Sequence, residues 1–418
     1  MSATQQSRIF TASCVALIVT AMTFAIRAGT LTELSNEFGL TDNQLGWMNS
    51  MAFWGFPIAT LIGGLIYNLI GSKRMVFIAF FCHLVGLVLW MTAGGLEWLV
   101  FSTLVIGFAN GTVEAGCNPL IADMYHDNKT TMLNRFHVWF PGGIVIGSLV
   151  GFAMGEIGLG WRLQVAIMLV PTAIYGYMIF GLRFPEATHS ETSTGTNIRS
   201  LVSPLFLFML VCMSLTAVTE LGTQQWVERI LGSSGAHPLL VLALVTGLMA
   251  IGRQFAGPVI HKLHPPGVLL GSAVIAAIGI YAMSMASGGM VYVAAILFAI
   301  GVMYFWPTML GFIGEYQPRT GALGMSLIGG VGMAATGYWQ PVIGTWLDNA
   351  RGEAVAAGFT GDAIELEAGR ATLDNLALFP LILIVLFTIL IVVMKRMSIE
   401  PLTSEEAAMD KAAEQPQP

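Results

Sequence analysis

Twelve apolar segments, each about 20 residues or longer, are the feature that most restricts the fold of this chain. A chain that crosses a bilayer must satisfy its backbone hydrogen bonds internally, and segments of this length are too long for barrel strands, so each is predicted to be a helix. The composition agrees, because only 10% of the residues are charged, against about 25% in soluble proteins. We predict an all-α integral membrane protein whose spans lie at roughly 9–31, 43–67, 75–94, 99–124, 136–155, 162–182, 203–227, 238–261, 267–286, 290–313, 321–346 and 375–396.

The first apolar segment is predicted to be a retained helix and not a signal peptide. It is longer than the usual apolar core of a signal peptide, lacks an A-x-A cleavage site and carries Arg27. Lys and Arg concentrate in cytoplasmic loops, so their positions predict the orientation. With a cytoplasmic amino terminus, Arg162, Arg229, Arg351 and Arg370 fall outside. The other basic residues of the loops fall inside: Arg8, Lys73, Arg74, Lys129, Arg135, Arg183, Arg199, Lys262, Arg319, Lys395, Arg396 and Lys411.

A polar, Ser/Thr-rich stretch between the sixth and seventh segments divides the chain into halves. We predict an N-terminal six-helix bundle over residues 1–184, a cytoplasmic linker over 185–202 and a C-terminal six-helix bundle over 203–396. The charged tail 397–418 is predicted to be disordered. An even number of spans places both termini in the cytoplasm, and we expect a bacterial inner (plasma) membrane.

The stretch 347–374 is predicted to be a long outward loop rich in acidic residues. Its AIELEAGRATLDN portion has helical propensity and is expected to form a short surface helix. We expect the acidic side chains of the loop to form a solvated surface without a specific role: Asp348, Glu353, Asp362, Glu365, Glu367 and Asp374.

The fourth segment contains a carboxylate, Glu114, where a charge is costly. Asn110, Glu114 and Asn118 are spaced i, i+4, i+8, which predicts one polar stripe along a helix. Intramembrane carboxylates normally face a protein interior or a water-filled cavity and handle protons, ions or substrate. Pro119 is predicted to kink the helix just after the stripe. The alternative is a neutral glutamic acid hydrogen-bonded between helices.

Other polar residues inside the spans are candidates for substrate binding. Arg27 could direct its guanidinium at sugar hydroxyls or an anionic substrate, or it could form an ion pair with Glu114 or Glu33 as a structural clamp. In the seventh segment the candidates are Glu220, Gln224, Gln225 and Trp226. Amides and carboxylates suit hydroxyl-rich ligands, and an indole can stack on a sugar. The alternative for this group is hydrogen bonding between helices near the membrane interface.

The remaining candidates are single residues in later segments. Trp306 and Gln340 are predicted to line a cavity, with ordinary helix packing as the alternative. His137, near the cytoplasmic entrance of the fifth segment, is expected to relay a proton or bind a sugar, with a hydrogen-bonded interfacial histidine as the alternative.

Several short motifs then point to a family. GGLIYNLIGSKR (63–74) resembles the loop between the second and third helices of the major facilitator superfamily, although Asn68-Leu69 replaces the usual Asp-Arg. EAGCNP (114–119) is similar to the E-x-x-x-N-P signature of the fucose–proton symporter family. E-L-G (220–222) with the nearby Trp226, the run FWPTMLGFIGEY and the Gly-rich eleventh segment resemble further motifs of that family.

The resemblance implies two pseudo-symmetric six-helix bundles around a central cavity and proton-driven uptake of a monosaccharide. It implies that Glu114 is the proton-coupling acid, and it places His137 where the family has a sugar-binding Gln. In the first helix, Thr30 stands at the expected position of the family's Asp. This departure leaves the coupling ion, H⁺ or Na⁺, and the substrate open.

We therefore predict a monomeric secondary transporter that takes up a monosaccharide with a cation, most simply a proton, by alternating access. A proton-driven exporter of metabolites or drugs, and a membrane receptor that transports nothing, are the alternatives. The sequence contains no P-loop, Rossmann fingerprint, G-x-S-x-G or HExxH motif, so we predict neither an enzyme nor a cofactor. Its four cysteines lack metal-type spacing, which predicts free thiols and no metal site. No basic patch suggests a nucleic-acid partner.

Overall fold

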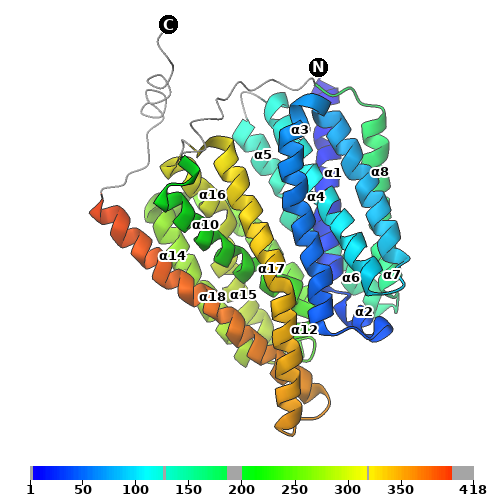
Figure 1. Cartoon of the computed structure of the whole chain (residues 1–418), viewed down its shortest axis with the longest axis vertical. Helices are drawn as coiled ribbons and strands as arrows, with labels where there is room; N and C mark the ends of the chain where they lie inside the picture. The colour runs from blue at the N-terminus through cyan, green and yellow to red at the C-terminus, as the bar shows by residue number, and fades with distance from the viewer. Residues whose placement is uncertain (1–2, 126–128, 186–199, 318–319, 398–418) are drawn as a thin grey trace.

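A computed structural model describes residues 3–125, 129–185, 200–317 and 320–397. These residues form helices joined by short turns, and no strand occurs among them (Figure 1). Most of the predicted linker and nearly all of the predicted disordered tail lie outside the described residues.

The helices fall into two groups in chain order. The first group is α1 (Ala3–Ala28), α2 (Leu31–Phe38), α3 (Asp42–Met91), α4 (Leu96–Met124), α5 (Lys129–His137), α6 (Trp139–Glu156), α7 (Trp161–Ala166) and α8 (Leu169–Phe180). The second group is α10 (Pro204–Ala217), the π-helix η2 (Val218–Gly222), α11 (Thr223–Gln225), α12 (Val227–Leu231), α13 (Pro238–Gln254), α14 (Ala256–Met285), α15 (Met290–Val302), α16 (Phe305–Tyr316), α17 (Gly321–Ala356) and α18 (Asp362–Arg396). Figure 1 shows them as two bundles, one blue to green and one green to red.

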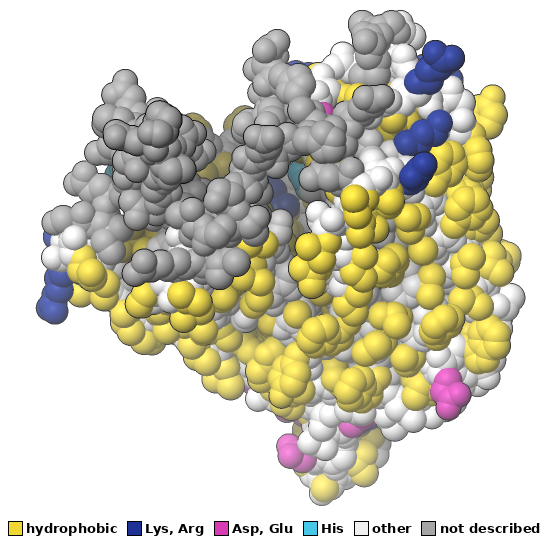
Figure 2. All heavy atoms as spheres, turned by 45° about the horizontal axis from the view of Figure 1, so that its top comes forward, with side chains coloured by type: hydrophobic (Ala, Val, Ile, Leu, Met, Phe, Trp, Pro, Cys, Tyr) yellow, Lys and Arg dark blue, Asp and Glu magenta, His cyan; other side chains and the backbone are white. Residues whose placement is uncertain are grey.

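The twelve predicted spans all fall on helices. Within the described residues, ten helical stretches are long and apolar enough to cross a membrane, and α13 and α17 occupy the predicted eighth and eleventh spans. The flanks of the molecule carry exposed apolar side chains, such as Leu65, Leu69 and Tyr177 with 74%, 78% and 83% exposure. Figure 2 shows this apolar surface, with basic side chains near one end and acidic side chains near the other. The helical membrane fold is confirmed.

We call the end with the start of α1, α5 and the start of α10 the near end, and the end with α2, α12 and the joined ends of α17 and α18 the far end (Figure 1). At the near end α3 turns at Gly71 between the second and third spans, with φ 73° and ψ 163°. In the other bundle α14 turns at His264 between the eighth and ninth spans, with φ 54° and ψ 158°.

The predicted outward loop is mostly helical. The eleventh span continues as α17 to Ala356, and α18 begins at Asp362, so residues 357–361 alone join the two helices. The prediction of a long loop with one short surface helix is therefore corrected. The helical propensity of the AIELEAGRATLDN segment is realised as the first turns of α18, because that helix extends beyond its apolar portion.

Candidate functional site

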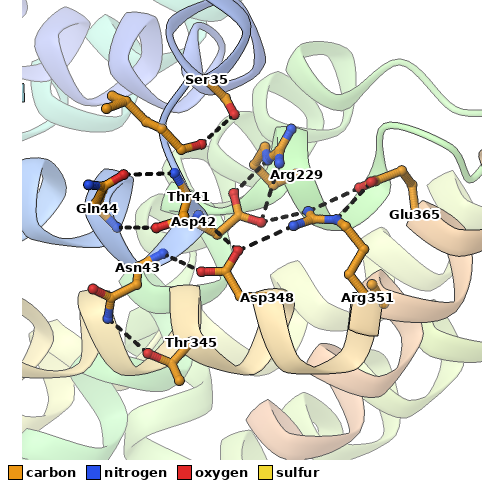
Figure 3. Close-up of polar contacts among 12 residues, drawn as sticks. Ser35, Thr41, Asp42, Asn43, Gln44, Arg229, Thr345, Asp348, Arg351 and Glu365 are labelled. Atoms are coloured by element: carbon orange, nitrogen blue, oxygen red, sulfur yellow. Dashed lines mark hydrogen bonds and ion pairs between the residues drawn. The ribbon is translucent and has the colours of Figure 1, made fainter. Parts of the chain in front are cut away.

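The two bundles are joined at the far end by ion pairs around Asp42. Asp42 is the first residue of α3 and is fully buried. Its carboxylate oxygens lie 2.8 Å from Arg229 Nε on α12 and 2.6 Å from Arg351 Nη2 on α17 (Figure 3). Arg351 also contacts Glu365 on α18 through Nε, at 2.7 Å. One buried carboxylate of the first bundle thus binds two arginines of the second.

A second carboxylate, Asp348 of α17, binds the backbone at the start of α3. Its oxygens accept from the backbone N–H of Asp42 at 3.0 Å and of Asn43 at 2.9 Å (Figure 3). A carboxylate at a helix amino terminus satisfies orphan N–H groups and interacts favourably with the helix dipole. The prediction that the acidic residues of 347–374 have no specific role is therefore wrong for Asp348 and Glu365.

Small residues bring α3 and α17 into direct contact below this network. A Cβ atom added to Gly46 would lie 2.5 Å from Pro341 Cα, and one added to Gly344 would collide with the Asp42 carbonyl oxygen. Glycine permits such close approach of two backbones. The far end is therefore closed both by ion pairs and by backbone packing.

Arg27, in the last turn of α1, is fully buried next to this closed end. Its Nε and Nη2 donate to the Gln225 side-chain oxygen at 3.1 and 2.5 Å. Gln225 in turn donates to the backbone oxygen of Phe24. The guanidinium carbon lies 5.0 and 5.5 Å from the ring centroids of Phe24 and Phe53. Neither Glu33 nor Glu114 pairs with Arg27, so the predicted ion-pair clamp is replaced by an amide contact between the bundles.

An apolar cluster surrounds this contact. Its buried members come from both bundles and are Phe24, Phe53, Leu221 and Met333, with Phe56, Phe140 and Trp306 packed against them. The Phe24 ring packs edge-on against Phe53 and Phe140, with centroids 5.5 and 5.6 Å apart. Trp306 thus packs against an apolar cluster whose buried members come from both bundles, and its predicted role in lining a cavity stays a prediction.

Glu114, Asn118 and His137 come together on the near side of the molecule. Asn118 Nδ2 donates to Glu114 Oε2 at 2.7 Å, and His137 Nε2 lies 3.1 Å from Asn118 Oδ1 and 3.9 Å from Glu114 Oε2. The side chains of Glu114 and His137 are 13% and 44% exposed. A carboxylate, an amide and an imidazole in this arrangement can exchange a proton and offer both donors and acceptors to a ligand.

Asn110 does not share this group. Its Oδ1 lies 2.8 Å from His83 Nε2, its Nδ2 donates to Thr23 Oγ1 at 3.0 Å, and it is fully buried. His83 Nδ1 lies 2.9 Å from the Tyr175 hydroxyl. This network ties α1, α3, α4 and α8 together inside the first bundle. The Asn110 amide is thus bonded within the first bundle and is not brought together with Glu114 and Asn118.

Glu220 lies in the π-helical turn η2 of the second bundle. Its Oε1 is 3.5 Å from Arg253 Nη2, its Oε2 has no hydrogen-bond partner, and the residue is 5% exposed. Arg253 Nε donates to the Met303 backbone oxygen at 3.0 Å, and its side chain is 26% exposed. Single π-turns inside helices occur frequently at functional sites. The pair thus links α13 to the turn that precedes Gln225.

Three further candidates lie elsewhere. Gln224 donates to Met249 Sδ at 3.5 Å and lines a small pocket inside the second bundle, while Trp226 is fully buried in the main core. Both side chains make packing contacts inside the protein, and their role as ligands stays a prediction. Gln340 is fully buried on α17, and neither polar atom of its amide has a partner.

Asp42, His83 and Arg253 were missed as site residues, although each had a signal. Thr41 and Gln44 form a capping box that marks the helix start next to Asp42. His83 is an ionisable residue within an apolar run, which by itself indicates a bonded or functional group. Arg253 follows the short apolar run of α13 directly.

Two bundles of apolar helices joined by side-chain ion pairs at one end, with charged groups between them, are typical of a membrane transporter. The chain belongs to the Major Facilitator Superfamily, whose match covers residues 13–361.

Relatives and solved structures agree with this assignment. The human solute carrier family 2, facilitated glucose transporter member 10 is 24% identical over 171 residues, which are 41% of this chain and 31% of that protein. The chain thus matches about a third of the length of the curated relatives. A bacterial homologue of the human lysosomal transporter Spinster has a TM-score of 0.74 at 17% identity, covering 93% of this chain and 97% of that one. A D-xylose–proton symporter has a TM-score of 0.71 at 14% identity, covering 89% and 96%.

Proposed function

We propose that the protein takes up a monosaccharide-class substrate together with a proton by alternating access. The observation that carries this proposal is the asymmetry of the two ends. The Asp42 network seals the far end, whereas Glu114 and His137 keep exposure on the near side. We take the near end as cytoplasmic, in a bacterial inner membrane, and the bundles as residues 1–184 and 203–396 of a monomer.

Glu114 is the coupling acid in this proposal. Binding or losing a proton changes the charge of this carboxylate, and with it the interactions that decide which conformation is preferred. Asn118 donates to the carboxylate, and His137 at 3.9 Å provides a route for the proton to the near side. Loading from outside and release inside would then accompany the opening and closing of the Asp42 network.

The monosaccharide class is supported by chemistry and by relatives. Amide and indole groups lie between the bundles at Gln225, Gln340 and Trp306, and Asn118 and His137 face the near side. Such groups supply donors, acceptors and stacking surfaces to hydroxyl-rich ligands. Relatives include a glucose transporter and a myo-inositol transporter. We propose these five residues as ligands, with Arg27 and Glu220 as charged positions behind them.

Proton-driven export of apolar metabolites is the second candidate. The cluster of Phe24, Phe53, Phe140, Met333 and Trp306 favours it, because an aromatic and methionine-lined surface accepts varied apolar ligands.

The test is uptake of radiolabelled hexoses into proteoliposomes under an inward proton gradient, with and without sodium. We expect gradient-stimulated uptake of a sugar, loss of the stimulation in Glu114→Gln, and survival of sugar exchange in that variant. Glu156→Gln, an exposed acid at the end of α6, is the matched control and should behave as wild type. Stimulation by sodium alone would reassign the ion. Absence of hexose uptake under both gradients would favour the exporter.

A further inference from the structure

Arg27 is a buried cation without a carboxylate partner. Among the described residues, three partly buried arginines of the second bundle pair with acids: Arg229 and Arg351 with Asp42, and Arg253 with Glu220. Arg27 has only the neutral Gln225 amide and two aromatic faces, and its Nη1 has no hydrogen-bond partner.

We infer that the transported substrate carries a carboxylate that pairs with Arg27, so that the substrate is a sugar acid and not a neutral sugar. This inference rests on the proposed function and specifies its substrate class.

Gln225 shows where the carboxylate would bind. Its single oxygen accepts from both Nε and Nη2 of Arg27, which is half of the bidentate geometry that a guanidinium makes with a carboxylate. The third nitrogen, Nη1, remains available for a further acceptor. While the far end is closed, the Gln225 amide oxygen therefore occupies the position of a charged acceptor beside Arg27. A substrate carboxylate can displace it from that position.

Unpartnered amides lie where α3 crosses α17, next to the Phe53 ring that Arg27 contacts. Gly46, Asn49 and Phe53 share one face of α3, because they are spaced by three and four residues. That face meets α17, where Gly46 packs on Gln340 and Pro341, and Phe53 packs on Gly337. Asn49 and Gln340 are fully buried at this crossing, and none of their amide atoms has a partner. Phe53 also carries the guanidinium of Arg27 over its ring.

Hydroxyl groups can donate to and accept from the unbonded amides of Asn49 and Gln340. A carboxylate is the matching partner for the unpaired Arg27. A buried polar group without a partner is destabilising, and a buried unpaired charge is more so. The carboxyl end of α1 and the aromatic rings compensate Arg27 only in part. A ligand with one carboxylate and several hydroxyls would satisfy the arginine and both amides together. One cation matches one negative charge, which favours a carboxylate over a doubly charged phosphate ester.

The arrangement also suits transport. Arg27 is fully buried while the far end is closed, so the ligand must reach it before the Asp42 network forms or from the near side after the aromatic cluster shifts. In both cases the acid stabilises the closed far end more than a neutral sugar does, because only the acid neutralises Arg27.

The experiment measures binding of glucose, glucuronate, acetate and glucose 6-phosphate to the purified full-length protein by isothermal titration, and uptake of the same compounds in proteoliposomes. In wild type we expect glucuronate to bind at least about ten-fold more tightly than glucose, a difference of about 1.4 kcal/mol. Acetate, which lacks the hydroxyls, and glucose 6-phosphate should bind more weakly than glucuronate. Galactose and galacturonate form a second matched pair.

Two variants separate the charge effect from folding. Arg27→Gln should remove the preference for the acid, so that glucuronate and glucose bind with similar affinity to this variant. Gln225→Glu supplies an internal carboxylate to Arg27, so it should raise the melting temperature and also abolish the preference for the acid. Arg162→Gln, which removes a surface arginine of the same bundle, should leave the preference unchanged.

Each outcome decides a separate point. Equal binding of glucose and glucuronate, or tighter binding of the phosphate ester, overturns the inference while sugar uptake leaves the proposed function standing. If glucuronate still binds more tightly than glucose to Gln225→Glu, Arg27 is not the group that binds the substrate carboxylate. If neither the neutral sugars nor their acids bind or are taken up, the proposed function itself fails.

Discussion

Gly71 and His264 occupy corresponding turns of the two bundles and share nearly the same backbone conformation. Their φ/ψ values are 73°/163° and 54°/158°, and each joins two spans at the near end. His264 is the one residue other than glycine with positive φ among the described residues. The repeat of this turn reflects the internal symmetry of the fold, with a glycine in one copy and a strained side chain in the other.

We expect His264→Gly to stabilise the protein by about 1 kcal/mol, because glycine adopts this conformation without steric strain. Gly71→Ala should destabilise it by a similar amount, since it introduces the strain that His264 already carries. Thermal unfolding in detergent measures both changes. A lower melting temperature for His264→Gly would show that the histidine side chain compensates the strain.

Asp42→Asn should shift the protein toward the state open at the far end. Removing the charge leaves Arg229 and Arg351 without their shared carboxylate, and breaking a buried pair from one side costs about 3–5 kcal/mol. Asn49→Cys, placed in a background without the native cysteines, reports the opening through labelling by a membrane-impermeant maleimide. We expect labelling to rise at least ten-fold in the Asp42→Asn background.

The matched control for this experiment is Glu37→Gln. Glu37 pairs with Arg162 at 2.7 Å, but both residues belong to the first bundle. Its loss should not change labelling at position 49. Equal labelling in the Asp42→Asn background and in its parent would show that backbone packing of α3 on α17 closes the far end without the ion pairs.

His83→Leu should destabilise the first bundle by about 2–3 kcal/mol, because it leaves Asn110 Oδ1 and the Tyr175 hydroxyl buried without partners. Tyr175→Phe removes only the hydroxyl and leaves one buried group, His83 Nδ1, without a partner, so it should cost less than His83→Leu, about 1–2 kcal/mol. Thermal unfolding measures both. In each variant, the ratio of proton-stimulated to sodium-stimulated uptake per folded molecule should equal that of wild type. A changed ratio would indicate that Asn110 takes part in transport.

Glu37 predicts a pH dependence at the far end. Hydrogen bonds from Arg162 and Trp161 lower the pKa of this carboxyl below its ordinary value of 4.5. Because the folded-state pKa is the lower one, the stabilisation is present above pH 4.5 and is lost as the pH falls through the folded value. The pair is half exposed, so we expect Glu37→Gln to cost only about 0.5 kcal/mol near neutral pH. The difference in melting temperature between wild type and variant should disappear below the folded pKa, and a difference that grows in acid would contradict this account.

The helical spans could be predicted because a chain that crosses a membrane must satisfy its backbone hydrogen bonds internally. Apolar segments of about 20 residues do so as helices. The extent of α17 and α18 could not, since helix continuation beyond the bilayer depends on tertiary contacts such as Arg351 with Asp42 and Glu365. Hydropathy predicts which segments lie in the lipid, but it does not predict how far a helix continues into polar residues outside it.

The polar stripe in α4 shows a second limit. Residues four apart share a face, but each step of four turns the helix by about 40° beyond a full turn, so eight residues accumulate about 80°. Glu114 and Asn118 therefore stay together, while Asn110 turns toward His83 inside the bundle. Spacing alone gives the helix and the shared face of Glu114 and Asn118 but not the neighbour of each side chain, because that neighbour comes from elsewhere in the sequence.

Asp348 has a consequence for the motion itself. It belongs to α17, yet it binds the first two N–H groups of α3 in the opposite bundle. When the bundles part at the far end, the first turn of α3 loses this acceptor and must find water or unwind. In the proposed cycle, opening would therefore expose these two amides to water, and faster hydrogen exchange at residues 42 and 43 would report it.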